Sequence, residues 1–274
     1  MRVAILASSP YSETACATAA RLAQIGYVPV GALTLRSWNR GTILRKVGQW
    51  GVRDSIQYAT AKLAPRAGVS QKPLNPHFEM ALRHQDGMFR NLREVGRTYG
   101  FPVVTCGNQN SPAAVFKMKR WAPDLAVFAG GSLLQDAALS VARLGVLNSH
   151  LALLPEIRGM SSPEWSLLQG VPPGITIHFM DRGIDTGPIL IRREFAVPPT
   201  CDSLTDLRQR MIAEGIELIA EAVSGLDRGT ILPVAQHDRE ADRQYFVMHD
   251  RLKTVAGQKL KAACGRLGSG GRDG

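Results

Sequence analysis

The chain has 274 residues, of which 45% are hydrophobic and 20% are charged. This composition suits one globular domain with a small appendage and excludes a disordered chain. The formal net charge is +10, the four cysteines form no CxxC pair, and no apolar run reaches the roughly 18 residues of a membrane-spanning helix, so we expect a cytoplasmic protein without disulfides or a zinc site.

The first 35 residues are typical of a strand, a helix and a second strand. The apolar run over 2–7 suits a buried parallel strand, and the Ala-rich stretch over 12–24 predicts a helix that ends at Gly26. A second strand is expected over 28–33. This order begins an α/β fold.

Residues 36–100 interrupt the α/β order. Apolar residues recur there at helical spacing between Arg and Lys, which predicts inserted basic helices, the last of them over 78–99. Residues 36–72 hold eight Lys/Arg and one acid, and residues 251–274 hold six and one. Such segments suit a phosphate group, an anionic membrane or nucleic acid, or they are simply solvated helix faces.

The α/β order then returns and predicts a mostly parallel, twisted sheet with helices on both faces. The expected strands are 102–105, 125–129, 146–148, 175–179 and 189–195, and the expected helices are 112–120, 135–140 and 203–224. We therefore divide the chain into an α/β domain over 1–200 that contains the inserted segment 36–100, a C-terminal helix and extension over 201–250, and a basic, disordered tail over 251–274.

Several common motifs of α/β enzymes are missing from the sequence. The first strand-to-helix turn, residues 7–12, contains no glycine, which disfavours a dinucleotide site. No GxxxxGK[ST] loop, GxSxG elbow or pair of His at i and i+4 is present. These absences disfavour kinases, α/β-hydrolases and metalloenzymes, and we expect no metal.

Three polar residues stand where a ligand site of an α/β sheet is expected. Asn148 and His150 end an apolar strand at i and i+2, so their side chains project from one face at its carboxyl end. Asp185 lies in the tight loop 180–188, 35 residues after His150, and is expected to turn back toward it. We interpret His178, on the preceding strand, as a wall residue whose polar atoms are satisfied.

This set suits acyl transfer in which the substrate itself supplies the nucleophile, because no Ser or Cys accompanies it. An amide and an imidazole can donate hydrogen bonds to an oxyanion, and a carboxylate can orient the imidazole and relay a proton. An isolated Asn-x-His pair or Asp-Gly loop would be structural. The interpretation depends on the order of the motifs Asn-x-His, Leu-Leu-Pro, Arg-Gly, Gly-Ile-Thr-Ile-His and Ile-Asp-Thr-Gly.

At these residues the sequence resembles the folate-dependent formyltransferases, a group that includes glycinamide ribonucleotide transformylases, methionyl-tRNA formyltransferases and sugar N-formyltransferases. The resemblance is specific over 122–195 and weaker over the first strand and helix. It implies a formyltransferase-type, Rossmann-like fold with 10-formyltetrahydrofolate as the donor. It also implies that Asn148, His150 and Asp185 are catalytic and that the formyl group passes directly to a primary amine.

The resemblance also implies two groups of binding residues. Two adjacent glycines are expected to let the main chain approach the edge of the pterin ring. The donor-binding residues are Phe128, Ala129, Gly130, Gly131, Leu133, Leu134, Met180, Asp181, Gly183 and Ile184. The acceptor-binding residues are Arg158, Gly159, Met160, Ser161 and Trp165.

The acceptor is expected to be a small-molecule amine, because the Arg-Gly and Pro-Glu-Trp pattern looks closest to enzymes that formylate amino sugars on nucleotide carriers. A natural-product amine and methionyl-tRNA are the alternatives. Only 79 residues follow Phe195, which is shorter than the C-terminal barrel domain of the methionyl-tRNA formyltransferases. This disfavours nucleic acid as a partner. Glycinamide ribonucleotide, an intermediate of purine synthesis, is disfavoured as the acceptor. Its transformylases usually have a His-rich stretch where residues 161–165 stand in this sequence.

Two alternative hypotheses involve no formyl transfer to an amine: a formyltetrahydrofolate hydrolase and a non-catalytic folate-binding module. The hydrolases usually carry an N-terminal regulatory domain, whereas this chain starts with the first strand. The basic segment 36–72 is expected to meet a diphosphate or to hold the protein near an anionic membrane. A homodimer through the C-terminal third is also consistent with the sequence.

Overall fold

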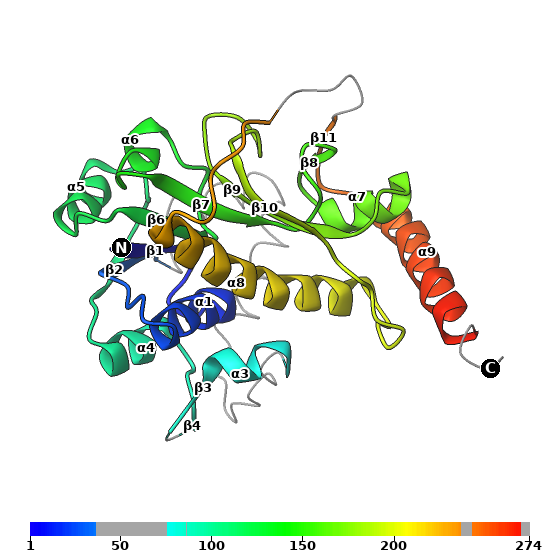
Figure 1. Cartoon of the computed structure of the whole chain (residues 1–274), viewed down its shortest axis with the longest axis horizontal. Coiled ribbons are helices and arrows are strands. Elements are labelled where there is room, and N and C mark those ends of the chain that lie inside the picture. Colours follow the sequence, from blue (N-terminus) through cyan, green and yellow to red (C-terminus); the bar gives the residue numbers. More distant parts are fainter. Residues whose placement is uncertain (37–75, 86, 237–242, 270–274) are drawn as a thin grey trace, which may run out of the picture.

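A seven-stranded sheet forms the centre of the computed structural model, which describes residues 1–36, 76–85, 87–236 and 243–269 (Figure 1). The strand order is β10-β9-β7-β6-β1-β2-β5. Five neighbouring strands run parallel, and β9 lies antiparallel to both β7 and β10. This confirms the predicted mostly parallel α/β fold. The strands are β1 (Val3–Ala7), β2 (Gly31–Leu35), β5 (Val103–Cys106), β6 (Leu125–Ala129), β7 (Gly145–His150), β9 (Gly174–Phe179) and β10 (Ile189–Glu194).

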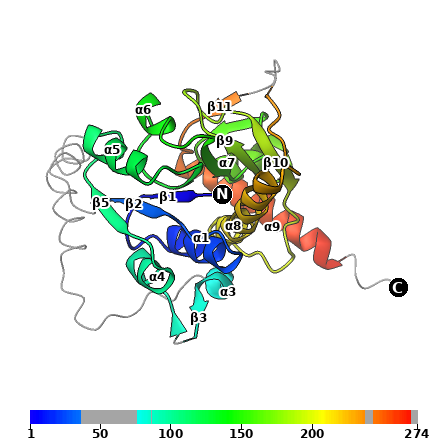
Figure 2. The same ribbon diagram turned by 60° about the vertical axis from the view of Figure 1, so that its left-hand side comes forward.

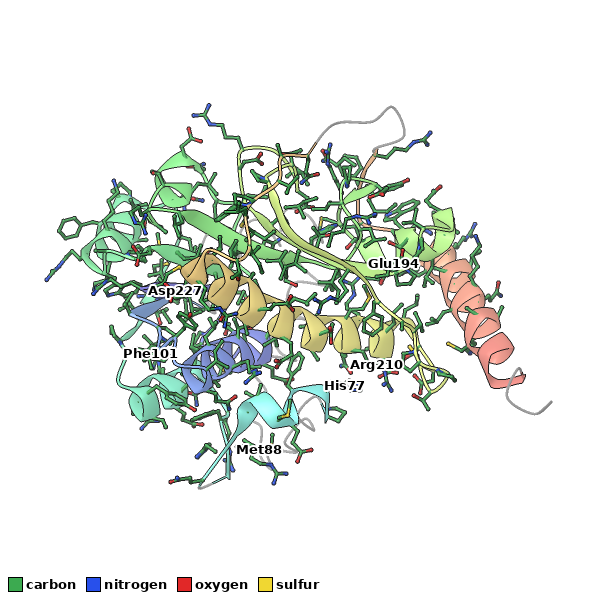
Figure 3. All side chains as sticks on the ribbon, viewed as in Figure 1. His77, Met88, Phe101, Glu194, Arg210 and Asp227 are labelled. Carbon is green, nitrogen blue, oxygen red and sulfur yellow. The ribbon has the colours of Figure 1, made fainter. Side chains whose placement is uncertain are left out.

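Helices cover both faces of this sheet, as Figures 1 and 2 show. One face carries α1 (Glu13–Gln24), α4 (Leu92–Tyr99) and α8 (Leu204–Arg228), and the other carries α5 (Pro112–Arg120) and α6 (Asp136–Leu139). The short η1 (Pro76–Phe78) and α3 (Glu79–Leu82) pack beside α1. At η1, His77 lies next to Arg210 of α8 (Figure 3), and both donate to the carboxylate of Asp206.

Alternation along the buried strands explains the two layers of core. On β1, Ile5 faces α1 and α8, whereas Leu6 faces α5, and both are fully buried. Burial of each such side chain stabilises the fold by roughly 1.5–3 kcal/mol. On β7, Leu147 belongs to the first layer and Val146 to the second. Asn148 therefore continues the face of Val146 at the carboxyl end of the sheet.

Polar caps define where the main helices begin. Ser12 accepts from the main-chain N–H of Ala15 at the start of α1, and Ser203 accepts from that of Asp206 at the start of α8. Ser111 caps α5, whose first residue is Pro112. Each cap satisfies a donor that the helix itself leaves unpaired, which is why the sequence predicted these starts well.

The expected helix over 78–99 is wrong. The structure has α3, a short hairpin of β3 (Arg83–His84) and β4 (Gly87–Met88), and then α4. Asn91 starts α4 anew, because its side chain accepts from the main-chain N–H groups of Arg93 and Glu94. Residues 37–75 lie outside the described ranges, and so does nearly all of the basic segment 36–72.

The expected disordered tail over 251–274 is also wrong as far as residue 269, because α9 (Asp250–Ser269) is a helix. Its buried residues Ala256, Leu260 and Cys264 are four apart, and α9 packs against α7 (Ser162–Gln169) and α8. Lys259 and Lys261, which lie between them, obscure this spacing in the sequence. The division into domains stays a prediction, and no helix in the described part is long and apolar enough to cross a bilayer.

A second, two-stranded sheet, which no sequence pattern predicted, lies beside the central one. In it β8 (Ile157–Gly159) pairs in parallel with β11 (Arg243–Tyr245). Figure 1 shows this pair in the upper right of the molecule, close to α7. The pairing brings the C-terminal part of the chain beside the carboxyl end of the central sheet, where the candidate site lies.

Candidate functional site

The site begins where β7 and β9 pair. Asn148 and His178 are opposite each other in the antiparallel register, and Asn148 Nδ2 lies 3.2 Å from His178 Nε2. His178 Nδ1 donates to the carbonyl of Phe179 at 2.8 Å, because a carbonyl only accepts. In the neutral ring Nε2 therefore accepts from the Asn148 amide. This contact fixes the amide and leaves its second N–H for a ligand.

Asp185 lies between two imidazoles. Its Oδ2 accepts from the Gly159 main-chain N–H at 2.8 Å and lies 3.3 Å from His150 Nδ1. Its Oδ1 lies 3.5 Å from His178 Nε2. The structure thus brings together Asn148, His150 and Asp185 as expected, and it adds His178, which the sequence analysis interpreted as a wall residue. The position of His178 directly across from Asn148 is the signal that identifies it.

His150 is buried, with 5% of its surface exposed. Its Nε2 donates to the carbonyl of Ile157 at 2.8 Å, and its Nδ1 faces Asp185. Burial lowers the pKa of His150 below its usual value, although the Asp185 carboxylate and the Ile157 carbonyl oppose this. At neutral pH the ring is therefore neutral. If it takes up a second proton, the Ile157 carbonyl accepts from Nε2 and the Asp185 carboxylate accepts from Nδ1.

The Asp185 carboxyl group is held in its ionised form. Burial by itself raises its pKa, but the interactions with His178 and His150 and the hydrogen bond from the Gly159 N–H together outweigh burial and lower the pKa. A carboxylate beside a neutral imidazole forms a pair that can accept a proton and share it.

These groups lie at a cavity of about 460 Å³. Among its described lining residues, only Asp185 carries a full charge, and most of the others are apolar or glycine. The lining comprises Phe128, Gly131, Ser132, Leu133, Asn148, Gly159, Met160, His178, Met180, Gly183, Ile184, Asp185, Gln244, Tyr245 and Phe246. His150 lies behind Asp185 and is not part of this lining.

The residues predicted to bind ligands fall into two groups. Eight of them line the cavity: Phe128, Gly131, Leu133, Met180, Gly183, Ile184, Gly159 and Met160. Seven do not: Ala129, Gly130, Leu134, Asp181, Arg158, Ser161 and Trp165. Their roles in binding stay predictions.

Gly131 is required for a reason that differs from the expected one. Its φ is +157°, and a Cβ there would lie 2.0 Å from the side-chain oxygen of Gln109. Gln109 is fully buried, donates to the Ala7 carbonyl and accepts from the Ser132 N–H. The glycine thus makes room for a side chain that ties the cavity loop to β1.

The C-terminal segment forms one wall of the cavity, which the sequence analysis missed. The ring of Trp165 stacks on Tyr245 with centroids 4.7 Å apart, and its Nε1 donates to the Phe246 carbonyl. Gly159, with φ +94°, lets the Tyr245 carbonyl approach to a point that any Cβ would occupy. Phe246 itself is 72% exposed at the cavity. In the sequence, the adjacent aromatic residues Tyr245 and Phe246 after a mostly polar stretch could have indicated this wall.

A second cavity of about 320 Å³ lies between α1 and α8, and Phe128 and Asn148 border both cavities. Its lining combines hydroxyl groups with aliphatic side chains, and its described residues carry no charge. They are Ser8, Ser12, Thr14, Thr18, Val127, Phe128, Ala129, Gly130, Asn148, Ser149, Leu151, Ile212, Gly215, Ile216 and Ile219. The buried Ser149 Oγ has no hydrogen-bond partner among the described residues.

Comparison with known families gives a match over more than half of the chain. The family model described as "Formyl transferase" matches residues 63–223. Among curated proteins, methionyl-tRNA formyltransferase from Trichlorobacter lovleyi is 34% identical over 152 residues, which cover 55% of this chain and 48% of that protein. The chain thus spans about half the length of the curated relatives it matches.

Solved structures give the same fold. Glycinamide ribonucleotide transformylase 1 from Symbiobacterium toebii is 20% identical with a TM-score of 0.55, covering 84% of this chain and 88% of that one. An N-formyltransferase from Helicobacter canadensis, solved with folinic acid and dTDP-3-aminofucose, is 11% identical with a TM-score of 0.55, covering 95% and 80%. At these identities the likeness concerns the fold alone.

Proposed function

This chain belongs to the formyl transferase family, and on that premise we propose that it moves a formyl group from 10-formyltetrahydrofolate to a primary amine, with an amino sugar on a nucleotide carrier as the acceptor. One observation carries the proposal. An ionised Asp185 lies between two imidazoles, beside the Asn148 amide, at a mostly apolar cavity.

The larger cavity fits the donor. Small-molecule sites are commonly about 300–1,000 Å³ and mostly apolar, with a few polar groups that fix orientation. Here Phe128, Met180 and Ile184 offer apolar walls to a flat ring system, and Asn148 and Asp185 supply the polar groups. When bound, the donor supplies a formyl group on N10 that is activated for transfer to an amine.

Asn148 is placed to stabilise the charge that develops during the transfer. The contact with His178 fixes its amide before any ligand binds, and the remaining N–H donates to the formyl oxygen as negative charge builds there. A donor that is already oriented costs no reorganisation during the reaction.

Asp185 and His150 handle the proton that the attacking amine must lose. Asp185 lines the cavity and accepts this proton, and His150 Nδ1, 3.3 Å from Oδ2, shares it. The pair would return the proton to the leaving N10 as the bond from the formyl carbon to N10 breaks and the new bond to the amine remains. The Ile157 carbonyl keeps the other ring proton on Nε2, so the lone pair of the neutral ring faces Asp185.

The second cavity supports a small acceptor with an uncharged body. It borders Asn148 from the side of α1 and α8, and it offers Ser and Thr hydroxyls beside the aliphatic Ile212, Ile216 and Ile219. A deoxyamino sugar, which carries both hydroxyl and methyl groups, matches this mixture. The Helicobacter canadensis protein of similar fold was solved with a folate and an amino sugar nucleotide, which also supports this class.

Methionyl-tRNA is the second candidate, because curated relatives that are 34–35% identical over about half of this chain are methionyl-tRNA formyltransferases. The test is to mix the protein with 10-formyltetrahydrofolate and either dTDP- or UDP-linked deoxyamino sugars, methionyl-tRNA, or no amine. Tetrahydrofolate release and the mass of the product are measured.

Detection of a formylated amino sugar would support the proposal. If formylated methionyl-tRNA were the sole product, the acceptor would be methionyl-tRNA and the amino-sugar part of the proposal would be wrong. Release of tetrahydrofolate without any amine would identify a hydrolase. Binding of the donor without release under all conditions would identify a folate-binding module.

A further inference from the structure

Asp185 holds a main-chain conformation that needs external support. Its φ is +56°, in the left-handed region that residues other than glycine seldom adopt. The direction of its carboxylate depends on this conformation, because the side chain starts from a Cα that the main chain orients. Residues in such conformations persist where surrounding contacts fix them, often at functional sites.

The side chain of Gln236 supplies contacts of this kind. Its Nε2 donates to the main-chain carbonyl of Asp185 at 2.9 Å and to that of Gly187 at 2.7 Å. Its Oε1 accepts from the guanidinium of Arg158 at 3.2 Å. The side-chain amide thus donates both of its N–H groups to the loop. The Arg158 guanidinium fixes which way the amide faces, because only the amide oxygen can accept a hydrogen bond from it.

Gln236 is itself held in place by the main chain. Val234 and Ile189 form an antiparallel bridge with two hydrogen bonds of 2.8 Å, at the point where the Asp185 loop enters β10. Two residues after this bridge, the half-buried Gln236 reaches back over the loop. The region that matches the family model ends at residue 223, so this support comes from outside it.

We propose that Gln236 is a positioning residue for the reaction: it holds the loop so that the Asp185 carboxylate points at His150 and His178. This inference rests on the proposed function for its catalytic consequence. Without the amide, the two carbonyls lose their donor and Asp185 can leave the left-handed conformation. Its carboxylate then turns away from His150 and from the Gly159 N–H.

The test uses Gln236→Met, which keeps the length of the side chain but removes both donors, and Gln236→Glu, which offers no donor when ionised. The matched control is Gln169→Met, because Gln169 is exposed at the end of α7. A displacement of about 1 Å at a catalytic group can lower the rate by on the order of 100-fold. We expect kcat to fall about this much in both Gln236 variants, with little change in the donor KM or in Tm.

A second readout does not depend on turnover. Histidine side-chain NMR follows the titration of His150 in the wild type and in each variant. Because the Asp185 carboxylate opposes the fall in the His150 pKa, its departure lowers that pKa further. We expect this shift in both Gln236 variants and none in Gln169→Met.

An unchanged His150 titration together with an unchanged kcat would overturn the positioning role. A variant that loses activity only because it unfolds would show a large fall in Tm, and its histidine titration would resemble that of a denatured chain, which also counts against the role. If the wild type transfers no formyl group but the titration shifts as expected, the positioning stands and the proposed function fails.

Discussion

The carboxylate of Asp185 lies 3.3 Å from Nδ1 of His150, although His150 ends β7, Asp185 lies in the loop between β9 and β10, and the two are 35 positions apart in the chain. The chain leaves β9 beside Leu147 and Val146, and the following loop turns back so that Asp185 meets His150 at the other end of β7. Burial keeps the His150 ring neutral, and the contacts around Asp185 keep its carboxyl group ionised. The pair is therefore poised to accept one proton.

The pair should be indispensable for turnover. We expect Asp185→Asn and His150→Ala each to lower kcat for formyl transfer by at least about 10²-fold, the range seen for general acid–base groups. Circular dichroism and Tm should show a folded protein. The control is Asp202→Asn, because Asp202 is exposed at the loop before α8. Rates near the wild type in either variant would remove the pair from the mechanism.

Asn148 and His178 should act as one unit. Asn148→Ala removes the N–H group that donates to the formyl oxygen, so kcat should fall on the order of 10²–10³-fold. The affinity for 10-formyltetrahydrofolate should not weaken. His178→Ala frees the amide and should cause part of the same loss. Because both changes affect one interaction, the double variant should be little worse than Asn148→Ala in a double-mutant cycle. Additive losses would show that His178 acts separately.

Ser149 should matter to the acceptor and not to the fold. Its buried hydroxyl has no partner among the described residues, so Ser149→Ala should leave Tm unchanged or slightly raised. The same change should raise the acceptor KM by roughly 2–10-fold, the value of one hydrogen bond, and leave the donor KM unchanged. Ser140→Ala, at an exposed position, is the control. A rise in the donor KM instead would contradict our placement of the two substrates.

Acidification should destabilise the protein through the same pair. The usual pKa is 6.5 for His and 3.8 for Asp, and both folded-state values lie lower. The unfolded chain then binds these protons at higher pH than the folded one, so stability rises with pH. The contribution of His150 is complete above about pH 6.5 and declines below it. The contribution of Asp185 is complete above pH 3.8 and is lost as pH falls through its folded-state pKa.

The measurement is Tm between pH 7.5 and 5 for the wild type, His150→Gln and the exposed control His249→Gln. His150→Gln should show a weaker dependence on pH, because its side chain cannot bind the proton. An equal slope in all three proteins would mean that His150 titrates as an ordinary exposed histidine.

The sequence was informative wherever local chemistry decides structure. Uninterrupted apolar runs marked the buried strands, and Ser12 and Ser203 marked helix starts through hydrogen bonds to residues a few positions away. The i, i+2 spacing of Asn148 and His150 placed them on one face without any tertiary information. The tight loop 180–188 marked Asp185 as a third candidate, and the family resemblance then implied a catalytic role for all three residues.

The features that the sequence did not reveal depend on contacts between distant segments. Pairing of β8 with β11 joins residues about 85 positions apart in the chain, and neither strand carries an alternating pattern. The hydrogen bonds of Gln236 to the Asp185 loop have no local signature. In α9, charged residues between the apolar ones conceal a helix that docking on α7 and α8 stabilises.

The pairing of β11 with β8 also bears on how such a protein can diversify. The central sheet, which carries Asn148, His150 and His178, and the loop that carries Asp185 are complete before residue 200, whereas Tyr245 and Phe246 come from a separate stretch of the chain at the edge of the cavity. Exchange of that stretch between homologues would reshape the wall of the larger cavity that Tyr245 and Phe246 form. Chimeric proteins joined after Gln236 would keep its hydrogen bonds to the Asp185 loop and change this wall alone.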